Sequence, residues 1–293
     1  MQGHKKSKYP LLAPVVKWVG GKRQLLDEIV ARFPPKFGTY YEPFFGGGAV
    51  LFSKQPSKAV INDLNSDLIK VYRLIKTDPD SLIEELKRFR NDKDLFYKVR
   101  ELDRNKLLFD KMSDVKRAAR LIFLNKTCYN GLYRVNSAGE FNTPFGGYKN
   151  PNIVNEAGIH AAHAYFSDID ITILNGDYAK AVETAKSKDF VYFDPPYDPI
   201  SNSSAFTGYN EGGFDKSEQE RLHGVCLELT KRGVYVLISN SSTPFIHDLY
   251  RDPEFHIDIV KAKRYVNSIG DRRGDVDEVL INNYAYVKKE RQK

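Results

Sequence analysis

Residues 39–48, which read TYYEPFFGGG, decide the fold of this chain. Their first part is aromatic and apolar, as in a buried β-strand, so we expect a strand over residues 39–44. Three glycines, Gly46 to Gly48, follow directly and predict a tight turn into a helix. A strand, a glycine turn and a helix in this order let backbone N–H groups approach a ligand closely. The same pattern also serves as a plain structural turn, so it does not identify a ligand by itself.

The segments on either side of this turn continue an α/β pattern. Apolar residues recur at helical spacing over residues 22–33, and Pro34-Pro35 ends that predicted helix. The apolar run 59–61 predicts a strand that ends at Asn62-Asp63, and a further helix follows. This alternation is typical of a parallel sheet. Asp63 lies near the ~20-residue spacing at which a carboxylate reaches ribose hydroxyls, although it also fits a helix cap.

A helical insertion interrupts the α/β pattern. We expect residues 77–149 to be inserted into an α/β domain built from residues 1–76 and 150–293. Residues 77–127 are charged and helix-like, with no predicted strand. Residues 129–148 are rich in Gly, Asn and Tyr and predict a hairpin or a long loop. The remaining predicted elements are helices over 113–127 and 215–232, strands over 169–174, 190–193 and 234–239, and one long or two short strands over 276–287.

Composition excludes several classes of protein. The chain has 293 residues, 41% hydrophobic and 28% charged, an ordinary globular balance for one large or two modest domains. Its formal net charge of +7 favours polyanionic partners. The 2 cysteines are too few for a disulfide framework, so a reduced, cytoplasmic setting is expected. No apolar stretch approaches the ~18 residues of a membrane span, and residues 1–9 do not resemble a signal peptide.

A second candidate site is Asp194-Pro195-Pro196-Tyr197, directly after the strand predicted over residues 190–193. Ligands of open α/β sheets bind outside the carboxyl ends of the strands, where these residues fall. The two prolines stiffen the backbone and fix the direction of its carbonyls. Asp194 and the Pro195 carbonyl can accept the two hydrogens of an exocyclic amine while Tyr197 stacks on the base. A proline-rich turn with a half-buried tyrosine explains the same residues without a ligand.

A third candidate is the basic segment 17–23, KWVGGKR. It fails the phosphate-loop pattern, because Val16 stands at the first glycine and Arg23 at the serine or threonine. Trp18 and Lys22 can still hold an adenine ring and a carboxylate, or form a basic surface turn.

Taken together, these motifs resemble the Dam-type (class alpha, D12) DNA adenine-N6 methyltransferases. In that class the glycine motif comes first, the target-recognition insertion next and Asp-Pro-Pro-Tyr last. The resemblance covers the chain from Lys17 to about Tyr284. It is carried by KWVGGK at residues 17–22, EPFFGGG at 42–48, ND at 62–63, YNGLYR at 129–134, GEFNTPFG at 139–146 and DPPY at 194–197.

The resemblance implies a Rossmann-like sheet that binds S-adenosylmethionine, and a mainly helical target-recognition insertion that carries a β-hairpin. It implies direct methyl transfer to N6 of an adenine flipped out of duplex DNA, within the site GATC. The catalytic residues it implies are Asp194, Pro195, Pro196 and Tyr197. The residues it assigns to S-adenosylmethionine are Trp18, Lys22, Glu42, Phe44, Gly46, Gly48, Asp63, Asp177 and Asp194.

The resemblance also assigns DNA contacts, mostly to the predicted hairpin. Tyr129 would insert between base steps, and Arg134 would bind a guanine through O6 and N7. Gly147 departs from the family, whose members often carry Arg there, and this removes one expected phosphate contact. The full set of implied DNA-contacting residues is Lys17, Tyr129, Asn130, Leu132, Arg134 and Pro144.

Other interpretations stay open on the sequence alone. Methyltransferases of this fold act on RNA or protein, but those that methylate glutamine or guanine usually carry Asn in place of Asp194. A silent DNA-binding relative would be expected to lose Asp194 or the glycine turn. A dinucleotide-dependent dehydrogenase leaves the tetrapeptide unexplained. The expected partner is double-stranded DNA, with a restriction endonuclease as a functional rather than physical partner, and the expected state is a monomer.

Three further segments are weighed for function. His160, His163 and Asp168 lack additional ligands for a metal and fit a polar helix surface, so no metal is expected. Residues 201–204 form a polar loop or a lid over the flipped base. Arg272-Arg273 form a basic stretch that contacts the DNA backbone or lies in solvent.

Overall fold

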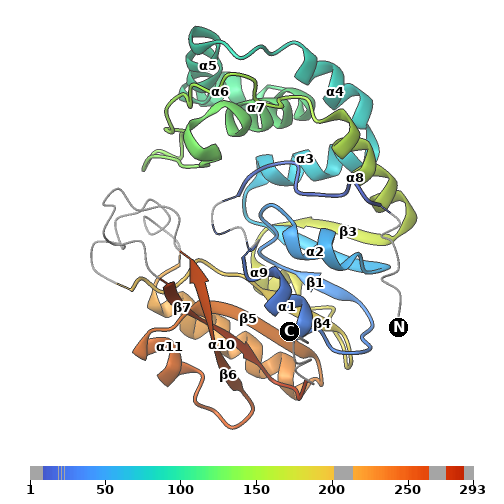
Figure 1. Cartoon of the computed structure of the whole chain (residues 1–293), viewed down its shortest axis with the longest axis vertical. Coiled ribbons are helices and arrows are strands. Elements are labelled where there is room, and N and C mark those ends of the chain that lie inside the picture. Colours follow the sequence, from blue (N-terminus) through green and yellow to red (C-terminus); the bar gives the residue numbers. More distant parts are fainter. Residues whose placement is uncertain are drawn as a thin grey trace. The chain divides into compact units, whose positions relative to one another are not determined.

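The computed structural model describes residues 9–18, 20, 22, 24–200, 214–263 and 275–286. The chain divides into two compact units that interleave along the sequence (Figure 1). The first unit comprises Met1–Gly21, Gly46–Ser57 and Asn65–Asn175, and the second comprises Lys22–Phe45, Lys58–Leu64 and Gly176–Lys293.

The second unit is built on a sheet with the strand order β2-β1-β4-β5-β7-β6. Four of its strands are parallel: β2 (Lys58–Asp63), β1 (Tyr40–Glu42), β4 (Phe190–Phe193) and β5 (Tyr235–Ser241). The other two are antiparallel to their neighbours, with β7 (Asp275–Asn282) between β5 and β6 (His256–Lys263). The predicted α/β class with a mostly parallel sheet is therefore confirmed.

The order of the parallel strands creates a switch point. From β1 the chain passes to β2 on one side, whereas β4 pairs with the other side of β1. In open α/β sheets, ligands bind at such a reversal, outside the carboxyl ends of the strands. Glu42 ends β1, and Asp194 follows the last residue of β4. The topology therefore brings two of the predicted motifs to one edge of this sheet.

Burial on both faces explains why the central strands are apolar runs rather than alternating ones. All four residues of β4 are buried, and so are all three of β1. On one side, side chains of β4 and β5 share a hydrophobic core with Leu222, Cys226 and Leu229 of α10. The helices of this unit are α1 (Leu26–Ala31), α9 (Tyr178–Ala181), α10 (Lys216–Lys231) and α11 (Pro244–Leu249).

The first unit is mainly helical, and Figure 1 shows α4 and α3 packed beside α7. Each helix from α3 to α8 begins at an Asn, Asp or Ser whose side chain accepts a backbone N–H of the first turn, a strong N-terminal signal. The α-helices of this unit are α2 (Ala49–Lys54), α3 (Ser66–Thr77), α4 (Pro79–Lys87), α5 (Lys93–Arg100), α6 (Lys106–Asp110), α7 (Asp114–Thr127) and α8 (Glu156–Asp168). The described part of this unit also contains two 3₁₀ helices, η1 (Glu101–Arg104) and η2 (Tyr129–Gly131), and the strand β3 (Asp170–Asn175).

Most predicted elements are confirmed, and the differences lie at the ends and in the last strands. The strand predicted over 39–44 ends at Glu42, and the helix predicted over 22–33 is described from Leu26 to Ala31. One long or two short strands were expected over residues 276–287, and the structure has the single strand β7 there. Its partner β6 was not predicted. No described helix has the length and apolar character needed to cross a bilayer.

Candidate functional site

Asp194 is the centre of a charged cluster at the carboxyl end of β4. The Lys22 ammonium lies 2.8 Å from Asp194 Oδ1, and the Ser239 hydroxyl donates to the same oxygen at 3.0 Å. Tyr192 and Ser239 also share a hydrogen bond of 2.9 Å. Both contacts to Asp194 fall on Oδ1, so the carboxylate is held from one side by a cation and a hydroxyl.

Burial and neighbouring polar groups act in opposite directions on the pKa of Asp194. Burial raises the pKa of the Asp194 carboxyl above its ordinary value, whereas Lys22 and the Ser239 hydrogen bond act to lower it. Burial likewise raises the pKa of Tyr197 well above its ordinary value. Tyr197 therefore stays protonated, and its hydroxyl donates a hydrogen bond to Glu278 Oε2 at 3.0 Å. Lys22 Nζ also lies 4.4 Å from the centre of the Tyr197 ring, a cation–π contact.

A buried amide framework holds the loop that follows β4. The Gln219 side chain donates to the Pro196 carbonyl at 2.9 Å, and Asn240 donates to Gln219 Oε1 at 3.0 Å. Asn240 Oδ1 accepts the backbone N–H of Asp198 at 3.0 Å. Gln219 is 1% exposed and Asn240 is 0% exposed. Because a buried amide with satisfied partners is rigid, this framework fixes the direction of the loop.

A second buried amide, Asn62, joins the loops around the carboxyl ends of β1 and β2. Its Nδ2 donates to the carbonyls of Pro43 and Gly176, each at 2.9 Å. Its backbone carbonyl accepts the N–H of Phe45 at 2.9 Å, and the carbonyl of Asp63 accepts the N–H of Gly176 at 3.3 Å. The predicted ligand residues Glu42, Phe44, Asp63 and Asp177 thus lie at strand ends or in loops that are joined through the Asn62 side chain.

Of these residues, Glu42, Phe44 and Asp177 also have defined side-chain partners. Glu42 is 3% exposed and accepts the Tyr40 hydroxyl at 2.9 Å. Phe44 stacks on Tyr178 with ring centroids 5.0 Å apart. Asp177 caps α9 and forms a two-point pair with Arg221 at 2.7 and 2.9 Å, and these hydrogen bonds lower its pKa.

The glycine turn belongs to the first unit and packs against Trp18. Gly46 has a φ of +50°, and a Cβ at this position would lie 2.7 Å from the Trp18 ring. Its carbonyl accepts the Tyr72 hydroxyl at 3.0 Å. Gly48 has a φ of +70° and precedes α2. Glycine is therefore required at Gly46 both by the backbone and by the neighbouring ring.

Lys17 and the turn after α7 are joined through Asn125, also within the first unit. Asn125 Oδ1 accepts the N–H of Lys17 at 2.9 Å, and Asn125 Nδ2 donates to the carbonyls of Lys17 and Gly131 at 2.7 and 3.0 Å. On this turn Tyr129 is 57% exposed, and Asn130 has a left-handed φ of 55°. The structure thus brings together the two separate segments to which DNA contacts were assigned.

The predicted hairpin is an irregular loop with two isolated bridges, Cys128 with Phe145 and Val135 with Phe141. Arg134 is exposed, and its Nε donates to Asn142 Oδ1 at 2.7 Å across the loop. The carbonyl of Leu132 accepts the Thr143 hydroxyl at 2.6 Å, and that of Pro144 accepts the N–H of Tyr129 at 2.9 Å. We call residues 129–146 the recognition loop.

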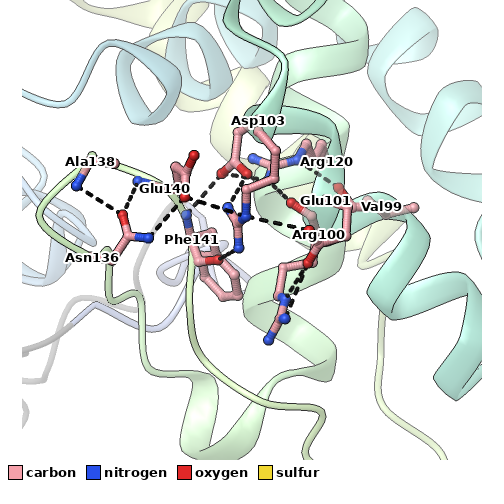
Figure 2. Close-up of polar contacts among 10 residues, drawn as sticks. Val99, Arg100, Glu101, Asp103, Arg120, Asn136, Ala138, Glu140 and Phe141 are labelled. Carbon is pink, nitrogen blue, oxygen red and sulfur yellow. Dashed lines mark hydrogen bonds and ion pairs between the residues drawn. The ribbon is translucent and has the colours of Figure 1, made fainter.

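A buried ion-pair cluster anchors the recognition loop to the helices (Figure 2). Asp103 Oδ2 lies 2.7 Å from Arg120 and accepts the N–H of Phe141 at 2.8 Å. Arg104 pairs with Asp103 and donates to the Phe141 carbonyl at 2.8 Å. Arg120 donates to the carbonyls of Val99 and Arg100 at 2.9 and 2.8 Å. Both backbone groups of Phe141 are therefore held by charged side chains.

The sequence did not single out the residues that position these groups. Ser239, Asn240, Gln219 and Glu278 lie 25 to 84 positions from Asp194 in the chain, and no local motif marks them. Predictions that fall on residues 201–204, on Arg23 and on Arg272-Arg273 lie outside the described residues. His163 binds the Ile75 carbonyl at 2.9 Å, and within the described part of the chain no three His, Cys, Asp or Glu side chains cluster as a metal site would need.

The sheet is mostly parallel, and the Asp-Pro-Pro-Tyr loop follows β4 at its switch point. These features place the chain in the class of Rossmann-like methyltransferases. The family described as D12 class N6 adenine-specific DNA methyltransferase matches residues 18–266, and the chain belongs to this family. Membership supports methylation of DNA at adenine N6 as its activity.

Named relatives match along nearly the full chain. "Type II methyltransferase M1.LlaDCHI" of Lactococcus lactis subsp. cremoris is 46% identical over 276 residues, which cover 94% of this chain and 96% of the relative. "Type II methyltransferase M.MjaIII" of Methanocaldococcus jannaschii is 43% identical, covering 92% and 99%. "DNA adenine methylase" of Escherichia coli (strain K12) is 35% identical, covering 90% and 93%.

Proposed function

We propose that the chain is a site-specific, S-adenosylmethionine-dependent methyltransferase that acts on N6 of an adenine flipped out of duplex DNA at GATC. The observation that carries the proposal is the Asp194 cluster. A carboxylate is held through Oδ1 by Lys22 and Ser239, at the carboxyl end of a buried parallel strand. The other oxygen, Oδ2, is then the one oriented to accept a hydrogen from a substrate amine.

The residues assigned to S-adenosylmethionine fit its chemistry. A cationic side chain and several carboxylates suit the amino acid part and the ribose hydroxyls, and Gly46 and Gly48 give a turn without side chains. When bound, this cofactor supplies an electrophilic methyl group on a sulfonium. The residues proposed to hold it are Trp18, Lys22, Glu42, Phe44, Gly46, Gly48, Asp63, Asp177 and Asp194.

The target nitrogen needs activation, because its lone pair is delocalised into the adenine ring. Asp194 Oδ2 and the Pro195 carbonyl accept its two hydrogens, which favours a more pyramidal nitrogen and stabilises the positive charge that develops there. The Pro196 carbonyl is already occupied by Gln219, so the Pro195 carbonyl is the acceptor available to the base. Once N6 carries the methyl group it must lose one proton, and Asp194 Oδ2, the proposed acceptor of an N6 hydrogen, would take this proton and pass it to water.

The Tyr197 ring stacks on the flipped base, which offsets part of the few kcal/mol that unstacking costs. The hydrogen bond from Tyr197 to Glu278 and the contact with Lys22 hold this ring in place. No covalent intermediate is required. Burial raises the pKa of the Cys128 thiol to about 12, and that of Cys226 is raised further, so neither is a reactive thiolate.

DNA recognition is proposed for residues 77–149, inserted in a catalytic domain of residues 1–76 and 150–293. Arg134 is exposed on the recognition loop, where its Nε donates to Asn142, and its guanidinium suits the bidentate contact proposed with a guanine of GATC. Tyr129 fits insertion between base steps, since more than half of its surface is accessible. The proposed DNA contacts are Lys17, Tyr129, Asn130, Leu132, Arg134 and Pro144.

The relatives named as Type II methyltransferases favour a restriction endonuclease as a functional partner of this chain. We further propose a monomer that acts on double-stranded DNA in the cytoplasm. A same-fold enzyme acting on RNA or protein, or a silent relative, is the alternative, and intact Asp194 argues against both.

Incubation with S-adenosylmethionine and unmethylated genomic DNA, followed by single-molecule sequencing of the modified bases, tests the proposal. We expect N6-methyladenine confined to GATC. Methylation in another context would retain the chemistry and overturn the assignment of the recognition loop. An unmodified genome from a protein that binds the cofactor would overturn the proposal and favour the alternatives.

A further inference from the structure

Tyr133 occupies a place in the first unit that the activity described so far does not use. Its ring stacks on Trp18 with centroids 4.9 Å apart and an angle of 21° between the planes. Its edge meets Phe141, with centroids 5.7 Å apart, and its hydroxyl is hydrogen-bonded to the Asn65 side chain. Tyr133 is therefore fixed by three neighbours, one of which is the ring proposed to bind the cofactor.

The backbone on both sides of this stack is tied together as well. Asn125 is 1% exposed, and its side-chain amide binds both the backbone N–H and the backbone carbonyl of Lys17. The same amide also donates to the carbonyl of Gly131. A Cβ at Gly131 would lie 2.6 Å from the Lys17 side chain, so the two segments are in close contact. Lys17-Trp18 and the turn 129–133 thus form one packed block.

Residues of this block are assigned to two different proposed ligands. Trp18 is assigned to S-adenosylmethionine, whereas Leu132 and Arg134, the chain neighbours of Tyr133, are assigned to DNA. Leu132 has extended dihedral angles (φ −79°, ψ 109°), and successive side chains of an extended segment point to opposite sides. Tyr133 packs inward on Trp18 while Arg134 is exposed. Tyr133 therefore links the Trp18 contact, through the chain, to Leu132 and Arg134, the residues proposed to read the DNA.

We propose that Tyr133 is a positioning residue that couples cofactor binding to recognition of the target site. The inference rests on the proposed function. A ligand on Trp18 restricts the Tyr133 ring and so orders the recognition loop before DNA arrives, which lowers the entropy that DNA binding must remove. By linkage, specific DNA strengthens cofactor binding by the same factor.

The test measures this factor. The dissociation constant of a labelled GATC duplex is determined with and without saturating S-adenosylhomocysteine, which lacks the methyl group and cannot react. In the wild-type protein we expect at least ~5-fold tighter DNA binding with this compound, the lower end of typical couplings. Tyr133→Leu should bring the ratio close to one, and Tyr133→Phe should retain it, because the phenyl ring still stacks on Trp18.

Tyr97→Leu is the matched control, since Tyr97 lies on α5 and contacts Phe96 and Arg100 rather than Trp18. It should keep the wild-type ratio. Hydrogen exchange of residues 129–134 gives a second readout without DNA. S-adenosylhomocysteine should slow exchange there in the wild type and in Tyr133→Phe, but not in Tyr133→Leu.

An unchanged ratio and unchanged protection in a folded Tyr133→Leu would overturn the inference and leave the proposed function intact. The inference would also be overturned if the wild-type protein binds each ligand separately but its DNA dissociation constant is the same with and without S-adenosylhomocysteine. A wild-type protein that binds neither S-adenosylhomocysteine nor DNA would instead overturn the proposed function, and the inference with it.

Discussion

At the scale of single residues, the orientation of Asp194 is set by groups far away in the chain. Lys22 and Ser239 both contact Oδ1, and Gln219 occupies the neighbouring Pro196 carbonyl. Two acceptors remain, Asp194 Oδ2 and the Pro195 carbonyl, and these are the groups proposed to bind a substrate amine. On this proposal, the site would select a group that has two hydrogens to donate.

Ser239→Ala should change the pH dependence of methyl transfer. The Ser239 hydroxyl donates to the carboxylate and so lowers the pKa of Asp194, which burial raises. Without this donor the pKa rises further, and the acidic limb of the kcat profile should move to higher pH while the KM for DNA stays near wild type. Stopped-time assays across the acidic range measure the shift, and an unmoved limb would show that Ser239 does not act on Asp194. Ser217→Ala, at the exposed start of α10, is the control.

Asp194→Ala should abolish methyl transfer and leave most of the DNA affinity intact, because Asp194 is proposed to contact the amine rather than the duplex. Radiolabelled methyl incorporation and a gel-shift titration measure the two quantities. Turnover at the wild-type rate in this variant would refute the proposed chemistry.

Arg134→Ala should weaken discrimination at one guanine of the target by ~1–3 kcal/mol, the usual worth of a bidentate contact. The comparison is between kcat/KM on GATC and on duplexes with that guanine replaced. Lys98→Ala on α5 removes the same charge from an exposed position outside the recognition loop and serves as control. Full specificity in Arg134→Ala would mean that another residue reads the guanine.

At the scale of elements, the recognition loop depends on the helices behind it. It has only isolated bridges of its own, and its central residue Phe141 is held through both backbone groups by Asp103 and Arg104. Asp103 and Arg120 are almost fully buried, with side-chain exposures of 9% and 7%. The order of this loop is therefore supplied by a buried ion pair rather than by a β-ladder.

Asp103→Ala should lower the free energy of unfolding by about 3–5 kcal/mol, because it leaves Arg120 buried without its counter-charge. Urea denaturation followed by circular dichroism measures the change. Glu84→Ala is the control: its pair with Lys87 on α4 is exposed by 68% and 46%, and such pairs contribute no more than about 1 kcal/mol. A loss of similar size in both variants would contradict the anchoring role.

At the scale of the whole molecule, the net charge of +7 should dominate non-specific DNA binding. The logarithm of the association constant should fall linearly with the logarithm of salt concentration, by ~0.9 for each phosphate contacted. Fluorescence anisotropy with a GATC duplex and with a duplex lacking this site measures the two slopes. Similar slopes with different intercepts are expected, and an affinity independent of salt would exclude phosphate contacts as the main attraction.

The α/β class, most of the strands and helices, and the motifs of the candidate site could be predicted without a structure. The buried strand 190–193 and its tetrapeptide could be predicted, because apolar runs and proline turns are local signals. The helices of the first unit carry their own caps, as Asn65 and Ser113 illustrate. Each of these features depends on a few consecutive residues, and these the sequence shows directly.

Tertiary structure alone decided which distant residues complete the site. Ser239 reaches Asp194 because β5 pairs with β4, and Glu278 reaches Tyr197 because β7 pairs with β5. Likewise, Tyr133 meets Trp18 only after the chain has folded back over more than a hundred residues. Contacts of this kind follow from strand order and packing, and no periodicity or local spacing encodes them.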